Sequence, residues 1–84
     1  AYDALARGGT CPAVLNAANE VTVESFLAGE IRFTDIAALN RRVLDAHIPQ
    51  PVNTLNELLE ADRWAREYAR AALARVPARV AASA

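Results

Sequence analysis

The residues best suited to acid–base or nucleophilic chemistry in this sequence are its single histidine, His47, and its single cysteine, Cys11. A histidine that acts as a general base needs a polar partner and a pocket. Neither is apparent around His47, which is followed by Ile48 and Pro49. We expect His47 to end a helix, where a cation meets the negative end of the helix dipole, and we assign it no catalytic role.

Cys11 stands near the start of a predicted helix, a position that can lower the pKa of a thiol and make it nucleophilic. No base lies near it in the sequence, so we interpret it as a packed cysteine. A lone cysteine cannot form a disulfide within the chain, and no cysteine or histidine stands at metal-ligand spacing. This usage suits a reducing compartment, and we predict a cytoplasmic location.

Two carboxylates, Glu20 and Glu24, are spaced one helical turn apart. Helical carboxylates of this kind bind metals in the cores of some bundles, but those sites also contain Glu-x-x-His pairs. Because His47 is not part of such a pair, we assign no metal ligand to this sequence.

Asn16, Asn19 and Glu20 share one side of an otherwise apolar predicted helix. Amides and carboxylates need hydrogen-bond partners if they are buried. Two interpretations stay open: these side chains fix helix contacts inside the domain, or they form an interface with a neighbouring domain.

Charge and hydropathy argue against nucleic-acid and membrane partners. The net charge is −1, and the arginines around Trp64 alternate with acids, so they do not form the basic surface of a nucleic-acid binder. We expect Trp64 to be a core or edge aromatic. No apolar run approaches the ~18 residues of a membrane span, and the first residues lack the pattern of a signal peptide.

The elements that position these residues are predicted to be helices, because alanine is abundant and the chain has only 3 Gly and 4 Pro. Residues 1–7 read as the end of a helix whose beginning is missing, so we expect the chain to be cut from a larger protein. Residues 77–84 read as a disordered tail. We predict that residues 1–84 form one all-α domain, a small up-and-down bundle of three to four helices.

The first complete helix is predicted over residues 12–28, with Thr10 as its N-cap and Gly29 closing it. Apolar residues extend around most of this helix, which indicates packing on more than one side. Its main apolar stripe consists of Val14, Ala17, Ala18 and Val21.

The next helix is predicted to begin with Thr34 as its cap, Asp35 in its first turn and Phe33 packed back onto it. Its buried stripe is predicted to be Ile36, Leu39, Val43 and Leu44. Residues 48–53 carry two prolines and are predicted to form an extended connector.

Thr54 and Glu57 have the spacing of a capping box. The chain beyond them is either one continuous helix or a short helix followed by a longer one over residues 62–75 that Asp62 caps. Its inward stripe is predicted to be Ala65, Tyr68, Ala69 and Ala72.

Residues 8–40, GGTCPAVLNAANEVTVESFLAGEIRFTDIAALN, closely resemble the start of the C-terminal helical domain of bacterial 1-deoxy-D-xylulose 5-phosphate reductoisomerases. The resemblance is carried by GGT with Pro12, by LNAANE at 15–20 and by IRFTDIAALN at 31–40. Phe26, Leu27 and a looser A-D-x-x-A-R-E run at 61–67 add to it. It spans about residues 1–75, and the family does not hold the position of Cys11 to one residue type.

The resemblance implies a parent enzyme of non-mevalonate isoprenoid biosynthesis, an NADP-dependent oxidoreductase and isomerase. Such enzymes use NADPH and Mg or Mn to rearrange and reduce 1-deoxy-D-xylulose 5-phosphate to 2-C-methyl-D-erythritol 4-phosphate. They are homodimers with a dinucleotide-binding domain, a catalytic domain and a C-terminal four-helix domain. Because the family places its catalytic, cofactor and metal residues in the first two domains, we assign none to this sequence.

Two hypotheses for function follow. In the first, the chain is the C-terminal structural domain of such an enzyme, braces the catalytic domain and is inactive alone. Its contact residues are then predicted to be Asn16, Asn19 and Glu20. In the second, the chain is a free-standing helical interaction module that binds a protein partner through the same face or through its arginines.

Overall fold

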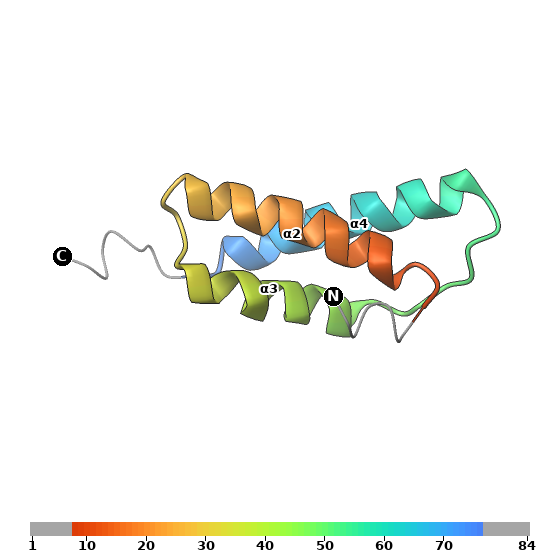
Figure 1. The fold of residues 1–84 in the computed structure, drawn as a ribbon, viewed down its shortest axis with the longest axis horizontal. Coiled ribbons are helices and arrows are strands. Elements are labelled where there is room, and N and C mark those ends of the chain that lie inside the picture. The colour runs from red at the N-terminus through yellow and green to blue at the C-terminus, as the bar shows by residue number, and fades with distance from the viewer. Residues whose placement is uncertain (1–7, 77–84) are drawn as a thin grey trace.

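The computed structural model describes residues 8–76, which form three helices and contain no strand. Helix α2 covers Cys11–Leu27, α3 covers Phe33–Ala46 and α4 covers Leu55–Leu73 (Figure 1). The helices alternate in direction along the chain, so the prediction of an all-α up-and-down bundle is confirmed. The predicted helix end at residues 1–7 and the predicted tail at residues 77–84 lie outside the described residues.

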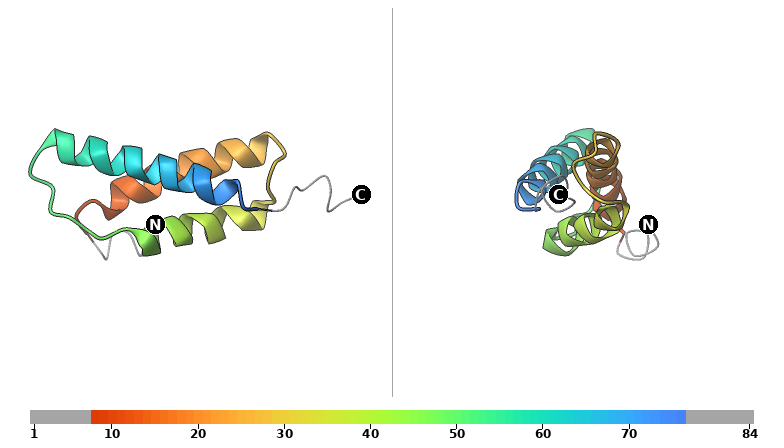
Figure 2. Two further views of the ribbon diagram at one scale, coloured as in Figure 1. Left: turned by 180° about the vertical axis from the view of Figure 1, so that it is seen from behind. Right: turned by 90° about the vertical axis from the view of Figure 1, so that its left-hand side faces the viewer.

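Helix α2 contacts both other helices, as its extensive apolar surface predicted. Seen end-on, the three helices are grouped around a common interior (Figure 2), where the buried apolar side chains form two clusters. The predicted apolar stripe of α2 is fully or almost fully buried, and so are Leu39, Val43 and Leu44 of α3. Ile36, the fourth member of the α3 stripe, is half-buried. The 3.6-residue spacing therefore identified the buried face of each helix.

The inward face of α4 is made almost entirely of alanine: Ala61, Ala65, Ala69 and Ala72. The first three join the main core cluster with the α2 stripe, so the two helices meet through small side chains. Trp64 and Tyr68 are half-buried and pack against the same cluster. This confirms the edge position expected for Trp64.

The prediction for Thr10 was wrong in its mechanism. Thr10 occupies the N-cap position of α2, but its side chain makes no cap hydrogen bond and its backbone is already helical, with φ −81° and ψ −5°. The reason is that its hydroxyl bonds to the connector after α3 instead, accepting a hydrogen bond from the Gln50 N–H at 3.1 Å. At the other end, Gly29 follows α2 with φ +80°, which confirms its role in closing the helix.

Helix α3 begins at Phe33 and not after Thr34, so the predicted cap was wrong here too. Arg32 holds the N-cap position, and its N–H donates to the Asp35 carboxylate at 2.9 Å. Asp35 therefore satisfies the helix terminus by reaching back three residues. Phe33 is 73% exposed, and its ring meets the ring of Phe26 edge-on, with centroids 5.7 Å apart.

Helix α4 is continuous, which settles the alternative that the sequence left open. The predicted capping box is confirmed: Glu57 N–H donates to Thr54 Oγ1 at 3.2 Å, and Thr54 N–H donates to Glu57 Oε1 at 2.8 Å. Asp62 does not start a second helix: it lies inside α4 and forms an ion pair with Arg66 one turn later. As predicted, residues 48–53 are neither helix nor strand.

Candidate domain-interface site

Asn16, Asn19 and Glu20 all lie on the exposed side of α2, and each has a partner within the domain. Asn16 Nδ2 donates to Glu20 Oε2 at 3.3 Å. Asn19 Oδ1 accepts a hydrogen bond from Asn40 Nδ2 of α3 at 2.9 Å. Glu20 pairs with Arg66 of α4 at 2.9 Å. Asn19 and Glu20 therefore connect α2 to α3 and α4, Asn16 bonds within α2, and all three residues are exposed.

Asn40 is the centre of a buried polar network that the sequence analysis missed. Its side chain is 9% exposed, and its Oδ1 accepts a hydrogen bond from the Thr22 hydroxyl at 2.9 Å. Among the described residues, no buried side-chain nitrogen or oxygen lacks a partner. A signal was available, because Asn40 is one turn from both Ile36 and Leu44 of the predicted stripe.

Arg66 is a joint between α4 and α2. Its guanidinium bonds to Asp62 one turn earlier and to Glu20 across the helix interface. The hydrogen bond with Asp62, and then the one with Glu20, raise the pKa of Arg66 above its already high value. The charge of Arg66 is thus held between two carboxylates at the edge of the bundle.

The second polar cluster, the Thr10–His47–Gln50 clasp, ties the start of α2 to the connector after α3. Thr10 is 1% exposed. Its Oγ1 is hydrogen-bonded to His47 Nε2 at 2.5 Å, and its N–H donates to the Gln50 carbonyl at 3.0 Å. The preceding Gly9 has φ +58°, and an added Cβ would lie 2.4 Å from that carbonyl oxygen. Only glycine fits at this position.

His47 ends α3, as predicted, but its environment does not favour a cation. Partial burial lowers the pKa of His47 below its ordinary value of 6.5, and its ring lies 5.2 Å from that of Trp64. The expectation of a charged histidine interacting with the helix dipole is therefore replaced by that of a neutral imidazole in the clasp. A cavity of about 310 Å³ lies beside it, lined by Thr10, His47, Gln50, Glu57, Glu60 and Ala61.

The other residues singled out for chemistry are placed as follows. Cys11 is fully buried in the core cluster, as expected for a packed cysteine. Glu24 is exposed on α2. Within residues 8–76, no group of three or more histidine, cysteine, aspartate or glutamate side chains is arranged to hold a metal ion. None of the three described helices is long and apolar enough to cross a membrane.

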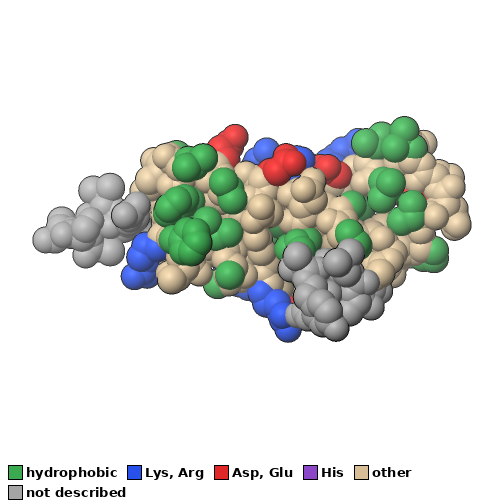
Figure 3. Space-filling view, in the orientation of Figure 1, with side chains coloured by type: hydrophobic (Ala, Val, Ile, Leu, Met, Phe, Trp, Pro, Cys, Tyr) green, Lys and Arg blue, Asp and Glu red, His purple; other side chains and the backbone are tan. Residues whose placement is uncertain are grey.

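Large apolar side chains are exposed at both ends of the bundle, as the space-filling view shows for one face (Figure 3). One end carries Leu27 and Phe33, beside the turn between α2 and α3. The other carries what we call the connector patch: Ile48, Val52, Leu55 and Leu59. Ile48 is 74% exposed and Leu55 is 70% exposed. An apolar group of this size on one end is typical of a surface that another protein segment covers.

Comparison with known proteins places the chain among one group of enzymes. It is 57% identical over 82 residues to the 1-deoxy-D-xylulose 5-phosphate reductoisomerase of Cupriavidus taiwanensis, covering 98% of this chain and 20% of that protein. It is 54% identical over 79 residues to the enzyme of the same name from Cupriavidus necator, covering 94% of this chain and 20% of that protein. The chain thus spans about a fifth of these relatives.

Comparison of the three-dimensional fold with solved structures relates the chain to the same group of proteins. A solved structure of 1-deoxy-D-xylulose 5-phosphate reductoisomerase from Zymomonas mobilis, in complex with NADPH, superposes with a TM-score of 0.83 at 36% identity. The match covers 88% of this chain and 20% of that one. Residues 1–68 also match the family described as DXP reductoisomerase C-terminal domain, and on these findings the chain belongs to that family.

Proposed function

We propose that this chain is the C-terminal structural domain of an enzyme that converts 1-deoxy-D-xylulose 5-phosphate to 2-C-methyl-D-erythritol 4-phosphate with NADPH. The observation that carries the proposal is identity above half, over almost the whole chain, to reductoisomerases about five times as long. In this proposal the nucleotide and the divalent Mg or Mn bind the other four-fifths of the parent. The sequence contains no G-x-G-x-x-G fingerprint for a dinucleotide.

The domain's proposed role is to brace the catalytic domain from one end of the bundle. The connector patch supports this role, because four large apolar side chains at one end are 42% to 74% exposed. Fully burying one leucine stabilises an interface by about 1.5–3 kcal/mol. Covering the exposed parts of Leu55 and Leu59 would therefore stabilise the contact with the neighbouring domain. The free energy gained would be a substantial share of a domain's net stability.

The first test separates the domain from its parent. The 84-residue chain alone should oxidise no NADPH in the presence of the sugar phosphate, whereas the full-length enzyme should turn over. Turnover by the isolated chain at a rate near that of the whole enzyme would overturn the proposal. The reading frame before codon 1 gives an independent check, since it should encode a dinucleotide fingerprint.

The second test concerns the connector patch. Leu55→Ser should lower the thermal stability of the full-length enzyme but leave that of the isolated chain almost unchanged, because Leu55 is exposed in the domain. Ala38→Ser, at an exposed position of α3, is the matched control and should change neither. Equal effects of Leu55→Ser in both contexts would show that this side chain faces no neighbour.

The predicted contact through Asn16, Asn19 and Glu20 remains a separate part of the proposal. Asn19 and Glu20 bond to other helices of the domain, whereas Asn16 bonds to Glu20 of its own helix, so Asn16 is the member best placed to serve a neighbour. Asn16→Ala should therefore destabilise the full-length enzyme without destabilising the isolated chain. If Asn16→Ala leaves the stability of both the full-length enzyme and the isolated chain unchanged, Asn16 is not part of the interface.

The remaining parts of the proposal concern assembly and location. The parent is proposed to be a cytoplasmic homodimer, as the family resemblance implies, and the catalytic domain of the same chain is the domain's partner. Sedimentation of the full-length enzyme should give the mass of a dimer, and a monomer at micromolar concentration would contradict it.

A further inference from the structure

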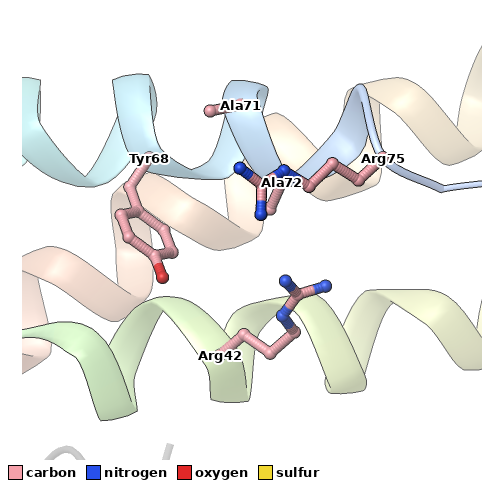
Figure 4. A pocket seen from close by; sticks show the side chains of 5 residues that line it. All are labelled: Arg42, Tyr68, Ala71, Ala72 and Arg75. Carbon is pink, nitrogen blue, oxygen red and sulfur yellow. The ribbon is translucent and has the colours of Figure 1, made fainter.

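A small pocket lies between α3 and α4, at the opposite end of α4 from the connector patch (Figure 4). Its volume is about 100 Å³, and it is lined by Arg42, Tyr68, Ala71, Ala72 and Arg75. Arg42 comes from α3, and the other lining residues come from the last turns of α4 and the residues just after it. The residues that line this pocket take no part in the Asn40 network, the Arg66 ion pairs or the Thr10–His47–Gln50 clasp.

The charge of this pocket is unbalanced. The Arg42 side chain extends from α3 into the gap between the helices, and the Arg75 side chain runs back along α4 beside Ala72, on the other side of that gap (Figure 4). Among residues 8–76, no carboxylate lines the pocket, and Asp45, one turn after Arg42, pairs with Arg41. Two like charges facing each other repel, whereas an anion placed between them is attracted to both. The arrangement is therefore suited to an anionic ligand.

The other lining residues fit such a ligand. The Tyr68 hydroxyl points into the gap between the two helices (Figure 4) and can donate one hydrogen bond. Ala71 and Ala72 carry only methyl groups, so the α4 side of the pocket leaves room for a ligand. Guanidinium groups present paired N–H donors that match the oxygens of phosphate and carboxylate groups.

We propose that this pocket binds a single phosphate group through Arg42, Arg75 and the Tyr68 hydroxyl. A volume of about 100 Å³ accommodates one phosphate group and is too small for a nucleoside. Two guanidinium charges match the two charges of a phosphate near neutral pH. The ligand is either inorganic phosphate or the terminal phosphate of a small phosphomonoester whose remainder projects into solvent. This inference does not depend on the proposed function.

The test is a titration of the 15N-labelled 84-residue chain with sodium phosphate at constant ionic strength, followed by NMR. The side-chain Nε–Hε signals of Arg42 and Arg75 and the amide signal of Ala72 should shift along saturable curves with one dissociation constant. Arg42→Gln and Arg75→Gln should each weaken binding about tenfold, since each removes one charge-assisted contact. Tyr68→Phe should weaken it less.

The matched control is Arg63→Gln, which removes the same charge from an exposed position on α4 outside the pocket. The dissociation constant of phosphate for this variant should equal that for the unchanged chain. Non-saturable shifts, or an equal loss in Arg63→Gln and Arg42→Gln, would show general screening of a charged surface and overturn the proposal.

A second titration, with glycerol 2-phosphate, distinguishes inorganic phosphate from a phosphomonoester as the ligand. Equal affinity for both compounds would identify the phosphate group as the ligand, and binding of inorganic phosphate alone would identify the free ion. Both results support the pocket. Failure of both compounds to shift the two arginine signals would refute it.

Discussion

Replacing Gly9 by alanine tests the clasp that joins the start of α2 to the connector after α3. An alanine at φ +58° costs about 1–2 kcal/mol for the left-handed backbone alone. Its Cβ would also lie 2.4 Å from the Gln50 carbonyl oxygen, so the connector must move away. That movement breaks the two hydrogen bonds between Thr10 and Gln50, each of which contributes about 1 kcal/mol.

The expected loss for Gly9→Ala is therefore about 3–4 kcal/mol of the free energy of unfolding, taken as the sum of the backbone and hydrogen-bond contributions. A chain of this size is stabilised by only about 4–12 kcal/mol in total. Urea unfolding followed by circular dichroism at 222 nm measures the change.

The neighbouring glycine supplies a matched control. Gly8 has φ +70°, but a Cβ added there meets no atom within 4 Å. Gly8→Ala should therefore lose only the backbone contribution of about 1–2 kcal/mol. If the two variants lose the same free energy within error, the close approach of Gly9 to Gln50 does not stabilise the domain, and the reasoning fails.

Four further predictions concern buried and titratable side chains. Asn40→Ala should destabilise the domain by about 1–3 kcal/mol in the same urea experiment, because it leaves the buried Thr22 hydroxyl without its side-chain acceptor; a neutral result would indicate that water replaces the amide. Stability should fall as the pH drops below 6.5, because folding lowers the pKa of His47 and protonation then favours the unfolded chain; His47→Gln should flatten this part of the pH profile. A second fall is expected below pH 4.5, because the Asn53 and Thr54 amides lower the pKa of Glu57, and Glu57→Gln should remove it. Cys11 is fully buried, so a thiol reagent should label it only on unfolding, and rapid labelling in the absence of urea would contradict the packed interpretation.

The helices and their buried faces could be predicted because they depend on spacing along one element. Val43 and Leu44 follow the helical period of α3, and the capping box of Thr54 and Glu57 is a contact between residues three apart. Such patterns involve few residues and can be recognised in the amino-acid sequence itself. The same reasoning found the proline-containing connector at residues 48–53.

Apart from the cap of α3, which Asp35 sets locally, the errors came from contacts between residues far apart in the sequence. The Thr10 hydroxyl could have capped α2, but Gln50 and His47, about forty residues later, occupy it instead. Asn40 was left out of the buried stripe because its amide is polar, although its spacing fits. Its partner Thr22 lies on another helix, and no local pattern identifies that pairing.

The phosphate pocket could not be predicted from the sequence for the same reason. Arg42 and Arg75 stand on separate parts of the sequence, and only the packing of α3 against α4 brings them together. The likeness to the reductoisomerases, in contrast, could be seen in residues 8–40 directly. Family membership was therefore predictable where the local site was not.

The alanine face of α4 also bears on how the domain responds to temperature. Six of the thirteen buried hydrophobic residues in the described part of the chain are alanine, and the largest of the others are Ile31, Leu39 and Leu44. The heat capacity of unfolding rises with the apolar area that becomes exposed, so a core this poor in bulky groups implies a small value. Alanine also has no rotamers to lose on folding. The curve of stability against temperature should therefore be broad and shallow, with a gradual thermal transition.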